Sequence, residues 1–308
     1  MNLFNNIVFY YLAINCIYMN IAILSRGVQL YSTQSLIKAA EMRNHHVAVI
    51  DPLQCKLIIE NGIPQVKYDN ELVDDLHAII PRIGASNTYF GSSLVRQFEM
   101  MGVFSSVSAE AIITSRDKWT CFQLLSKANI PTPKTILGNL KNIESLLDEI
   151  EDTPVIIKIL KGTHGQGVIL AETKQSALAT IETLEALGAR YIIQEYVEES
   201  QGSDLRIIVV DGVVIAAMKR QSKEGEFRSN LHRGGSSENV TLSYQEEAIA
   251  LRAAKVLRLG VCGVDILQSN RGPLVLEINS TPGLEGIENT TGKNISRSII
   301  GFIERNKK

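Results

Sequence analysis

The chain has 308 residues, of which 45% are hydrophobic and 21% are charged, an ordinary composition for a globular protein with two or three core-forming units. The formal net charge is −2, which excludes the global basic surface that non-specific nucleic-acid binding needs. The four cysteines lie far apart without a C-x-x-C pair, which argues against a zinc ribbon or a thioredoxin-type site and favours a reduced cytoplasmic compartment.

The N-terminal segment is uncharged and largely apolar. Its residues 7–24 are long enough for a short membrane span. A secretory signal needs a basic region at its start, and residues 1–6 contain no Lys or Arg. Residues 19–25 have the pattern of an opening strand of a domain. We therefore interpret Met19 as the natural start and residues 1–18 as a non-native or disordered extension, with an N-terminal anchor as the alternative.

Residues 19–113 alternate between strand and helix patterns, which predicts a small parallel α/β domain. The expected strands are residues 20–24, 46–52 and 75–82, and the expected helices are residues 33–43 and 89–102. The carboxyl ends of parallel strands face a ligand crevice, so Arg82 is a possible substrate contact, with a structural salt bridge as the alternative.

A second unit is expected at residues 114–200. A helix with Ser115 as its N-cap is predicted to run to about residue 129, where Pro131 and Pro133 form a linker. An amphipathic helix is predicted from residue 142.

A glycine-rich loop, residues 161–167, joins an apolar strand at 155–160 to a second strand at 168–172. A P-loop or a dinucleotide motif would lead from a strand into a helix, so this loop is expected to be a hairpin lid whose backbone N–H groups approach a nucleotide. An ordinary hairpin turn is the alternative. Lys158 favours the phosphate interpretation, because a cation buried in an apolar strand needs a partner.

A helix at 175–187 precedes a strand at 190–197, which ends in an acid, an aromatic residue and an apolar residue. Such a segment could line an adenine edge. These residues alone favour the simpler interpretation of a strand that leaves the core with a polar end.

A third unit is expected at residues 201–308, and Asp211-Gly212 predicts a tight hairpin within it. A helix is predicted at 245–259. Several cations of this unit suit the binding of phosphates and of a carboxylate substrate, with a solvated basic loop as the alternative. They are Arg206, Arg220, Arg228 and Arg233.

Two apolar strands near the C-terminus, residues 261–267 and 273–279, carry three oxygen donors. Glu277 and Asn279 are two positions apart and point to the same face of their strand, and Asp265 lies on the neighbouring strand. The turn-like residues 268–272 predict a hairpin that brings the three together. Mg²⁺ and Mn²⁺ favour such ligands, although each acid could instead cap a strand or pair with an Arg.

These pieces, in this order, resemble the ATP-grasp superfamily, and within it the RimK-type α-L-glutamate ligases. The resemblance covers residues 19–306. Its most specific motifs are RDK (116–118), GTHGQGV (162–168), QEY (194–196), FRSNLHRGG (227–235), GVDIL (263–267) and LEINSTPGLEGIE (276–288). The implied fold class is α/β: an ATP-grasp fold with an N-terminal parallel α/β domain and two α+β subdomains that clamp ATP.

The resemblance also implies roles for single positions. The nucleotide phosphates would contact Lys118, Lys158, Gly165, Gln166 and Gly167. The adenine pocket would use Glu195, Tyr196 and Val197, and Asp204 would hold the ribose region. The ATP site would include Arg228, Ser229 and Asn230, of which Arg228 and Asn230 would also meet the acyl phosphate. Two Mg²⁺ or Mn²⁺ ions would bind Asp265, Glu277 and Asn279, with Glu277 bridging them. The tetrahedral oxyanion would be stabilised by Arg220, Arg228 or Arg233.

The implied activity is ATP-dependent addition of L-glutamate to the C-terminus of ribosomal protein S-six through an acyl phosphate. The implied protein is a cytoplasmic homo-oligomer, a dimer or a tetramer, with no direct nucleic-acid or membrane contact. Two alternatives stay open. One is an ATP-grasp ligase with another acceptor, such as a cofactor tail, an amino-acid carrier protein or a growing poly-α-glutamate. The other is a non-catalytic nucleotide-binding regulator.

Overall fold

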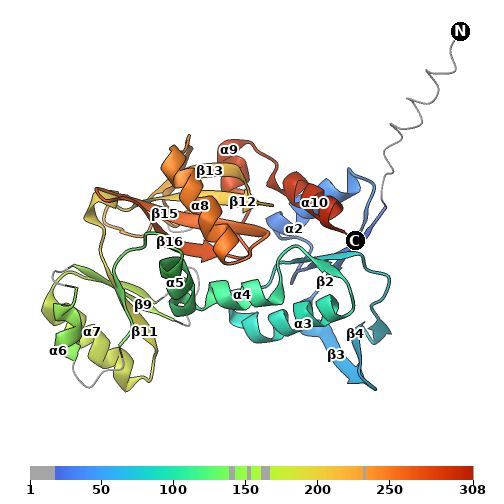
Figure 1. Ribbon diagram of the computed structural model, residues 1–308, viewed down its shortest axis with the longest axis horizontal. Helices are drawn as coiled ribbons and strands as arrows, with labels where there is room; N and C mark the ends of the chain where they lie inside the picture. The colour runs from blue at the N-terminus through green and yellow to red at the C-terminus, as the bar shows by residue number, and fades with distance from the viewer. Residues whose placement is uncertain (1–17, 139–142, 151–153, 161–166, 232–233, 308) are drawn as a thin grey trace, which may run out of the picture. The chain divides into compact units, whose positions relative to one another are not determined.

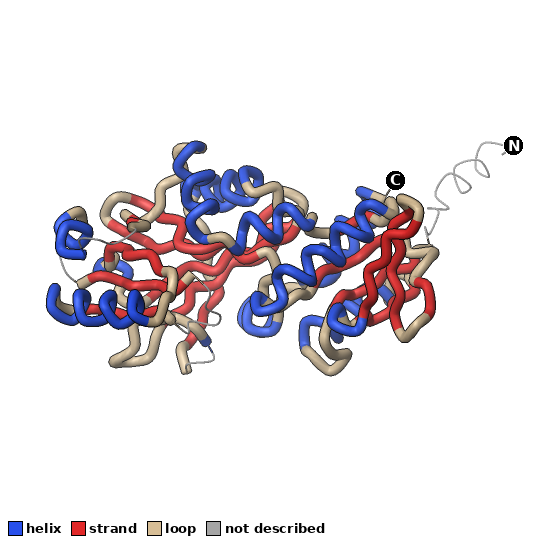
Figure 2. Tube along the Cα trace, turned by 90° about the horizontal axis from the view of Figure 1, so that it is seen from below, coloured by secondary structure: helices blue, strands red, loops and turns tan. Residues whose placement is uncertain are grey.

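A computed structural model describes residues 18–138, 143–150, 154–160, 167–231 and 234–307. The chain divides into two compact units, and each is described by itself. Unit 1 comprises residues 1–82, 93–106 and 296–308, and unit 2 comprises residues 83–92 and 107–295. In both units the strands lie side by side in continuous sheets with helices against them (Figure 2).

Unit 1 contains the predicted parallel sheet, with the strand order β2-β1-β6-β7. Its strands are β1 (Asn20–Leu24), β2 (His46–Ile50), β6 (Ala78–Pro81) and β7 (Phe104–Ser105). The neighbouring helices are α2 (Tyr31–Glu41), α3 (Thr88–Met100) and α10 (Ile295–Asn306). Four of the five residues of β1 are buried, as expected for the apolar central strand of a parallel sheet.

The C-terminal helix α10 belongs to unit 1 through an ion cluster that is distant in sequence. Glu304 accepts a hydrogen bond from His45 Nε2 at 2.8 Å and forms a two-point ion pair with Arg43. Burial raises the pKa of Glu304, but the hydrogen bonds from Arg43 and His45 outweigh this effect and lower it. The last helix therefore belongs to unit 1, whereas the sequence had placed it in the third unit, residues 201–308.

A small antiparallel sheet, β3-β4-β5, was not predicted. It consists of β3 (Cys55–Glu60), β4 (Ile63–Tyr68) and β5 (Glu71–Leu72). The first turn has positive φ at both Asn61 (52°) and Gly62 (78°), which is the conformation that two-residue hairpins require. This Asn-Gly pair was the available sequence signal.

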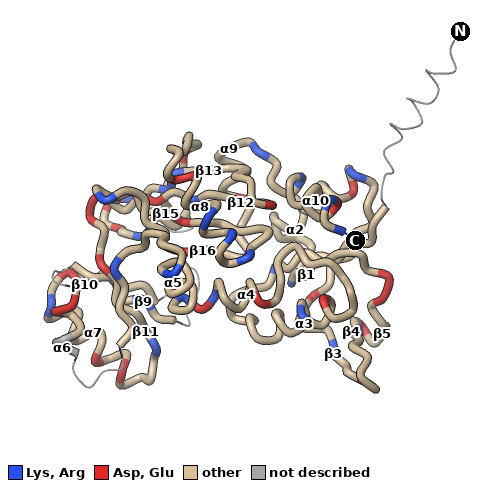
Figure 3. Tube along the Cα trace, viewed as in Figure 1, with Lys and Arg blue, Asp and Glu red and all other residues tan. Residues whose placement is uncertain are grey.

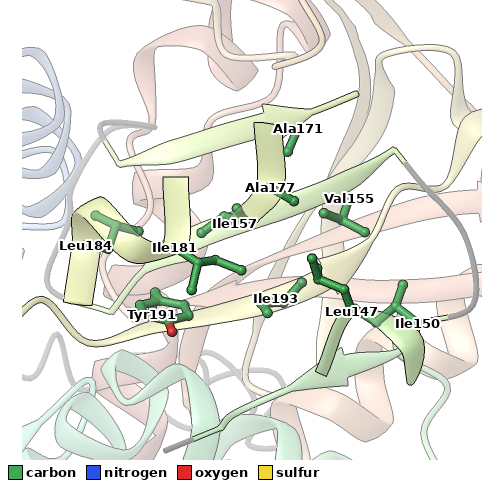
Figure 4. Packing of buried hydrophobic residues seen from close by; sticks show 10 residues of the cluster. All are labelled: Leu147, Ile150, Val155, Ile157, Ala171, Ala177, Ile181, Leu184, Tyr191 and Ile193. Atoms are coloured by element: carbon green, nitrogen blue, oxygen red, sulfur yellow. The ribbon is translucent and has the colours of Figure 1, made fainter. Parts of the chain in front are cut away.

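The first part of unit 2 is a four-stranded sheet of order β10-β9-β11-β8, called the central sheet below. It consists of β8 (Thr135–Ile136), β9 (Val155–Ile159), β10 (Val168–Ala171) and β11 (Tyr191–Glu195). Helices α6 (Ile143–Asp148) and α7 (Lys174–Ala186) pack on one face, and Figure 4 shows the apolar cluster between helices and strands. The antiparallel pairing of β9 with β10 confirms the predicted hairpin around the glycine-rich loop.

The second part of unit 2 is a five-stranded antiparallel sheet of order β14-β13-β12-β15-β16. It consists of β12 (Ser203–Val210), β13 (Val213–Gln221), β14 (Ser236–Asn239), β15 (Val261–Ser269) and β16 (Gly272–Asn279). Helix α8 (Tyr244–Val256) covers one face of this sheet (Figure 1), and α9 (Glu285–Thr291) follows β16. The predicted Asp211-Gly212 hairpin is confirmed, with positive φ at both residues.

The predicted helix start at Ser115 is wrong. Ser115 lies inside α4 (Ala109–Arg116), and its hydroxyl donates to the carbonyl of Ile112. The following helix, α5 (Lys118–Lys127), begins after Asp117, whose carboxylate accepts the N–H of Thr120 at 3.0 Å. A carboxylate at the N-cap also favours the positive end of the helix dipole, which explains why Asp117 and not Ser115 is the cap.

Among the described residues there are also short helices η1 (Pro52–Gln54), η2 (Ala85–Asn87) and η3 (Glu198–Ser200). Within the described part of the chain, no helix combines the length and the apolarity that crossing a bilayer demands.

Candidate functional site

The hairpin of β15 and β16 places the three predicted oxygen donors on one face of the five-stranded sheet. Asp265 lies directly opposite Glu277, and Gly263 lies opposite Asn279. A β-bulge leaves Leu276 without a partner on β15, because Ile266 pairs with Val275. The bulge places Val275 and Glu277 on opposite faces of the sheet, which simple alternation along β16 did not predict.

Asp265 is buried, with 3% of its surface exposed, and two arginines bind its carboxylate. Arg206 Nε donates to Oδ1 and Arg206 Nη2 donates to Oδ2 at 2.6 Å, while Arg220 Nη2 lies 3.0 Å from Oδ2. Burial by itself raises the pKa of Asp265, but the charges of Arg206 and then Arg220 reverse this and hold the pKa below its ordinary value. Asp265 is thus ionised at neutral pH, and the arginine pairing that the sequence left open is present.

Glu277 and Asn279 differ from Asp265 in their surroundings. Glu277 is exposed and Asn279 is half-buried, and among the described residues neither side chain has a hydrogen-bond or ion-pair partner. The third oxygen comes from an amide, and no three His, Cys, Asp or Glu side chains in the described ranges form a metal cluster by themselves. Asp265 retains one lone pair on Oδ1, so two carboxylates and one amide oxygen fit a hard divalent cation.

A second pair of carboxylate and guanidinium groups, Asp204 and Arg220, lies beside Asp265 on the same face of the sheet. Asp204 accepts two hydrogen bonds from Arg220, from Nε at 2.7 Å and from Nη2 at 2.6 Å. Asp204 also accepts the hydroxyl of Ser229 at 2.7 Å. Burial lowers the pKa of Arg220, but Asp265 and Asp204 outweigh this effect and raise it above its ordinary value. The resemblance assigned Asp204 to the ribose region, and the structure places its carboxylate against Arg220 and Ser229.

Two lysines lie near these acids. Lys158 on β9 is 9% exposed, and its Nζ donates to Oε1 of Gln194 at 2.6 Å. The pKa of Lys158 is lowered to about 8: burial is the largest cause, Lys118 acts in the same direction, and Glu277 and Asp265 oppose the shift. Lys158 is thus within electrostatic range of Glu277 and Asp265 and of Lys118, which starts α5, and two neighbouring cations suit the binding of nucleotide phosphates.

The glycine-rich loop is described only at its last residue. Gly167 has φ +75°, and its carbonyl accepts the N–H of Ile159 at 2.8 Å. A Cβ at this position would lie 3.0 Å from the side chain of Ile159, so the close approach of the two strands explains the glycine. Gly165 and Gln166, predicted to contact phosphate, lie outside the described residues.

The predicted adenine segment lies at the end of β11. The Glu195 carboxylate accepts the backbone N–H of Lys134 at 2.7 Å and a hydrogen bond from Arg271 Nη2 at 2.5 Å. Tyr196 is half-buried and Val197 is buried. Arg271 lies in the turn between β15 and β16, so Glu195 connects the central sheet to the five-stranded sheet within unit 2.

Arg228 and Asn230 lie in the segment after β13. Arg228 forms a two-point ion pair with Glu226, at 2.8 and 2.9 Å, and its guanidinium stacks 5.1 Å from the ring centre of Phe227. Hydrogen bonds from Arg228 lower the pKa of Glu226 to about 2. Asn230 is half-buried, and Arg233, the third predicted oxyanion contact, lies outside the described residues. Acidic and basic positions are interspersed over the elements of unit 2 (Figure 3).

Arg116 of the RDK motif forms several hydrogen bonds that the sequence did not predict. Its guanidinium donates to the carbonyls of Ile83 and Gly84, to Thr88 Oγ1 at 2.9 Å and to Thr281 Oγ1 at 3.3 Å. Burial lowers the pKa of Arg116 to about 10, which leaves it charged at neutral pH. It thereby joins the segment after β6 to the turn that follows Asn279. Arg82, at the carboxyl end of β6, is half-buried, and burial lowers its pKa to about 10.

The chain is similar to known proteins over nearly its whole length. Residues 115–303 match the RimK-like ATP-grasp domain, and residues 19–112 match the RimK PreATP-grasp domain. A protein of Teredinibacter turnerae named "Probable alpha-L-glutamate ligase" is 53% identical over 289 residues, covering 94% of this chain and 96% of the relative. A protein of the same name from Hydrogenovibrio crunogenus is 50% identical over 291 residues, covering 94% and 97%.

Solved structures share the fold. The ATP-grasp ligase PsnB, in complex with a phosphomimetic variant of its minimal precursor, Mg and ADP, has a TM-score of 0.72 at 20% identity, covering 94% of this chain and 99% of that one. The D-alanine–D-alanine ligase of Bacillus anthracis in complex with ATP has a TM-score of 0.68 at 17% identity, covering 94% and 97%. These similarities confirm the predicted ATP-grasp fold.

Proposed function

The chain belongs to the RimK-like ATP-grasp family, and we propose that it is an ATP-dependent ligase that adds L-glutamate to the C-terminal glutamate of ribosomal protein S-six. The names of its curated relatives support the glutamate ligase activity. The family resemblance stated above is the basis for S-six as the acceptor. PsnB, which shares the fold, is a ligase in complex with a precursor, and this supports an acceptor that is a peptide or a protein.

One observation carries the proposal. Lys158 of the central sheet lies within electrostatic range of Glu277 and Asp265 on the facing strands of the five-stranded sheet, and also of Lys118 at the start of α5. This combination suits a nucleotide triphosphate with its divalent cations, because the lysines are complementary to phosphate and the oxygen donors are complementary to metal. A purely structural cluster would not need Glu277 and Asn279, whose side chains have no partner among the described residues.

We assign the binding roles as follows. Lys118 and Lys158, with Gly165, Gln166 and Gly167 of the lid, hold the phosphates. Glu195, Tyr196 and Val197 line the adenine pocket, and Arg228, Ser229 and Asn230 complete the ATP site. Two Mg²⁺ or Mn²⁺ ions are held by Asp265, Glu277 and Asn279. When bound, these ions neutralise the negative charge of the phosphates.

The chemistry needs no covalent catalyst from the protein. A carboxylate is a poor acyl donor until phosphoryl transfer from ATP to the acceptor carboxylate, with release of ADP, makes an acyl phosphate. The amine of L-glutamate then attacks the acyl carbon, loses a proton, and phosphate leaves as the amide bond forms. The protein positions these groups and stabilises the oxyanion through Arg220, Arg228 or Arg233.

The test is an acceptor mass-shift assay. The full-length protein is incubated with ATP, Mg²⁺, L-glutamate and either S-six, S-six lacking its C-terminal glutamate, or free glutamate. We expect the mass of intact S-six to rise by whole glutamyl residues with one ADP per residue added. Glutamylation of the truncated S-six or of free glutamate alone would reassign the acceptor. ADP formation without any glutamylated product would contradict the ligase assignment.

A further inference from the structure

Four charged side chains form an alternating row across three adjacent strands of the five-stranded sheet. Asp204 and Arg206 lie two positions apart on β12, Arg220 on β13 faces Asp204, and Asp265 on β15 faces Arg206. The row therefore reads Asp204, Arg220, Asp265 and Arg206, with zero net charge. Such a row is compatible with burial because every charge has an opposite neighbour and a hydrogen bond.

The hydrogen-bond count shows how much of Asp265 remains available to a cation. A carboxylate offers about four lone-pair positions. Arg206 takes one position on Oδ1 and one on Oδ2, and Arg220 Nη2 takes the second position on Oδ2. One position on Oδ1 remains, on the face that Asp265 shares with Glu277.

Asp204 determines the orientation of Arg220. It binds both Nε and Nη2 of Arg220, so only the second N–H of Nη2 reaches Asp265, at the longer distance of 3.0 Å. Ser229 donates a third hydrogen bond to Asp204, which fixes the orientation of that carboxylate. Without the negative charge of Asp204, Arg220 would have a single anionic partner in the row, and its planar guanidinium would turn to bind Asp265 at two points.

We infer that Asp204 is a positioning residue for the metal site: by holding Arg220, it keeps one oxygen of Asp265 available to a divalent cation. The inference rests on the proposed function, because it takes Asp265 as a metal ligand. It differs from the ribose-holding role that the resemblance implied. A ribose contact would act on the nucleotide, whereas this arrangement acts on the cation.

The experiment separates these two roles by measuring two affinities on the full-length protein. The Mn²⁺ Kd is measured by electron paramagnetic resonance at saturating ADP, and the ADP Kd is measured by calorimetry without metal. For Asp204→Asn we expect the Mn²⁺ Kd to rise about tenfold, the scale at which partners of metal ligands act, with the metal-free ADP Kd unchanged. Asp211→Asn removes a negative charge at the exposed tip of the same hairpin and should change neither affinity.

A second variant keeps the inference testable if the loss of one buried charge disturbs the fold. Asp204→Asn/Arg220→Gln removes both members of the pair and leaves Asp265 with Arg206. We expect it to bind Mn²⁺ more tightly than Asp204→Asn does. An unchanged Mn²⁺ Kd in Asp204→Asn, whether or not the ADP Kd rises, overturns the inference and leaves the proposed function in place. Absence of Mn²⁺ binding by the unaltered protein with ADP overturns the metal site and the inference together.

Discussion

Lys158 is expected to lower the unfolding free energy of the protein while it binds the phosphates of ATP. Both effects can be measured on the same variant. Its pKa falls from 10.5 to about 8, mainly because burial penalises the charged form. At about 1.4 kcal/mol per pH unit, the folded state bears a penalty of about 3 kcal/mol while Lys158 is charged. Replacement by Met removes the penalty but leaves the buried Gln194 oxygen without its donor, which costs about 1–3 kcal/mol. We therefore expect the unfolding free energy to rise by about 1 kcal/mol in Lys158→Met. It should rise by more in Lys158→Met/Gln194→Leu, which also removes the buried Gln194 oxygen.

The pH dependence follows from the sign of the shift. Below pH 8 the lysine is protonated in both states, and the folded protein bears the whole penalty. Between about pH 8 and 10.5 the unfolded chain holds more protons, so the unaltered protein becomes more stable as the pH rises. The advantage of Lys158→Met should be largest at pH 7 and should shrink across this window.

The assay uses the single tryptophan of the chain, Trp119, which lies in α5 beside Lys118 and reports on the unfolding of unit 2. Denaturant unfolding of the nucleotide-free protein is followed by its fluorescence at pH 7 and at pH 9.5, with ATP affinity measured in parallel. Lys118→Met, at a half-buried position, is the matched control and should bring no comparable gain. If both Lys158 variants are less stable than the unaltered protein at both pH values, the burial argument is refuted. Retained ATP affinity in Lys158→Met would refute the phosphate role.

Three further outcomes are expected. Glu277→Gln should abolish ADP release while calorimetry shows ATP binding that is only weakened, and full turnover by this variant would contradict the metal assignment. Asp117→Ala should lower the unfolding free energy of unit 2 by about 1 kcal/mol through loss of the α5 cap, and Ser115→Ala should lower it less; the reverse order would restore Ser115 as the cap. Arg116→Met leaves backbone carbonyls without donors and should lower the unfolding free energy by about 2–3 kcal/mol. Thr281→Val removes one of the Arg116 contacts and should lower it by less than about 1.5 kcal/mol. Similar effects of the two changes would show that the Thr281 contact dominates.

Local chemistry was sufficient for most elements of the fold. The hairpins of β9 with β10 and of β15 with β16 were predicted because apolar runs were separated by glycine-rich or polar turns. The Asn61-Gly62 hairpin was missed although its turn signal is equally strong, because no clear apolar alternation surrounds it. The cap of α5 was misplaced by two residues, since Ser115 and Asp117 are both good caps by residue type and the sequence did not show that α4 continues through Ser115 to Arg116.

The sequence alone determined that oxygen donors occupy one face of a C-terminal hairpin, because strand alternation and a short turn are local properties. The tertiary structure decided which partners those donors have. Asp265 meets Arg206 and Arg220 because β12 lies between β13 and β15, an order set by packing between residues about 40–60 positions apart. The contact of Arg116 with Thr281 and the association of α10 with unit 1 depend on distant contacts in the same way.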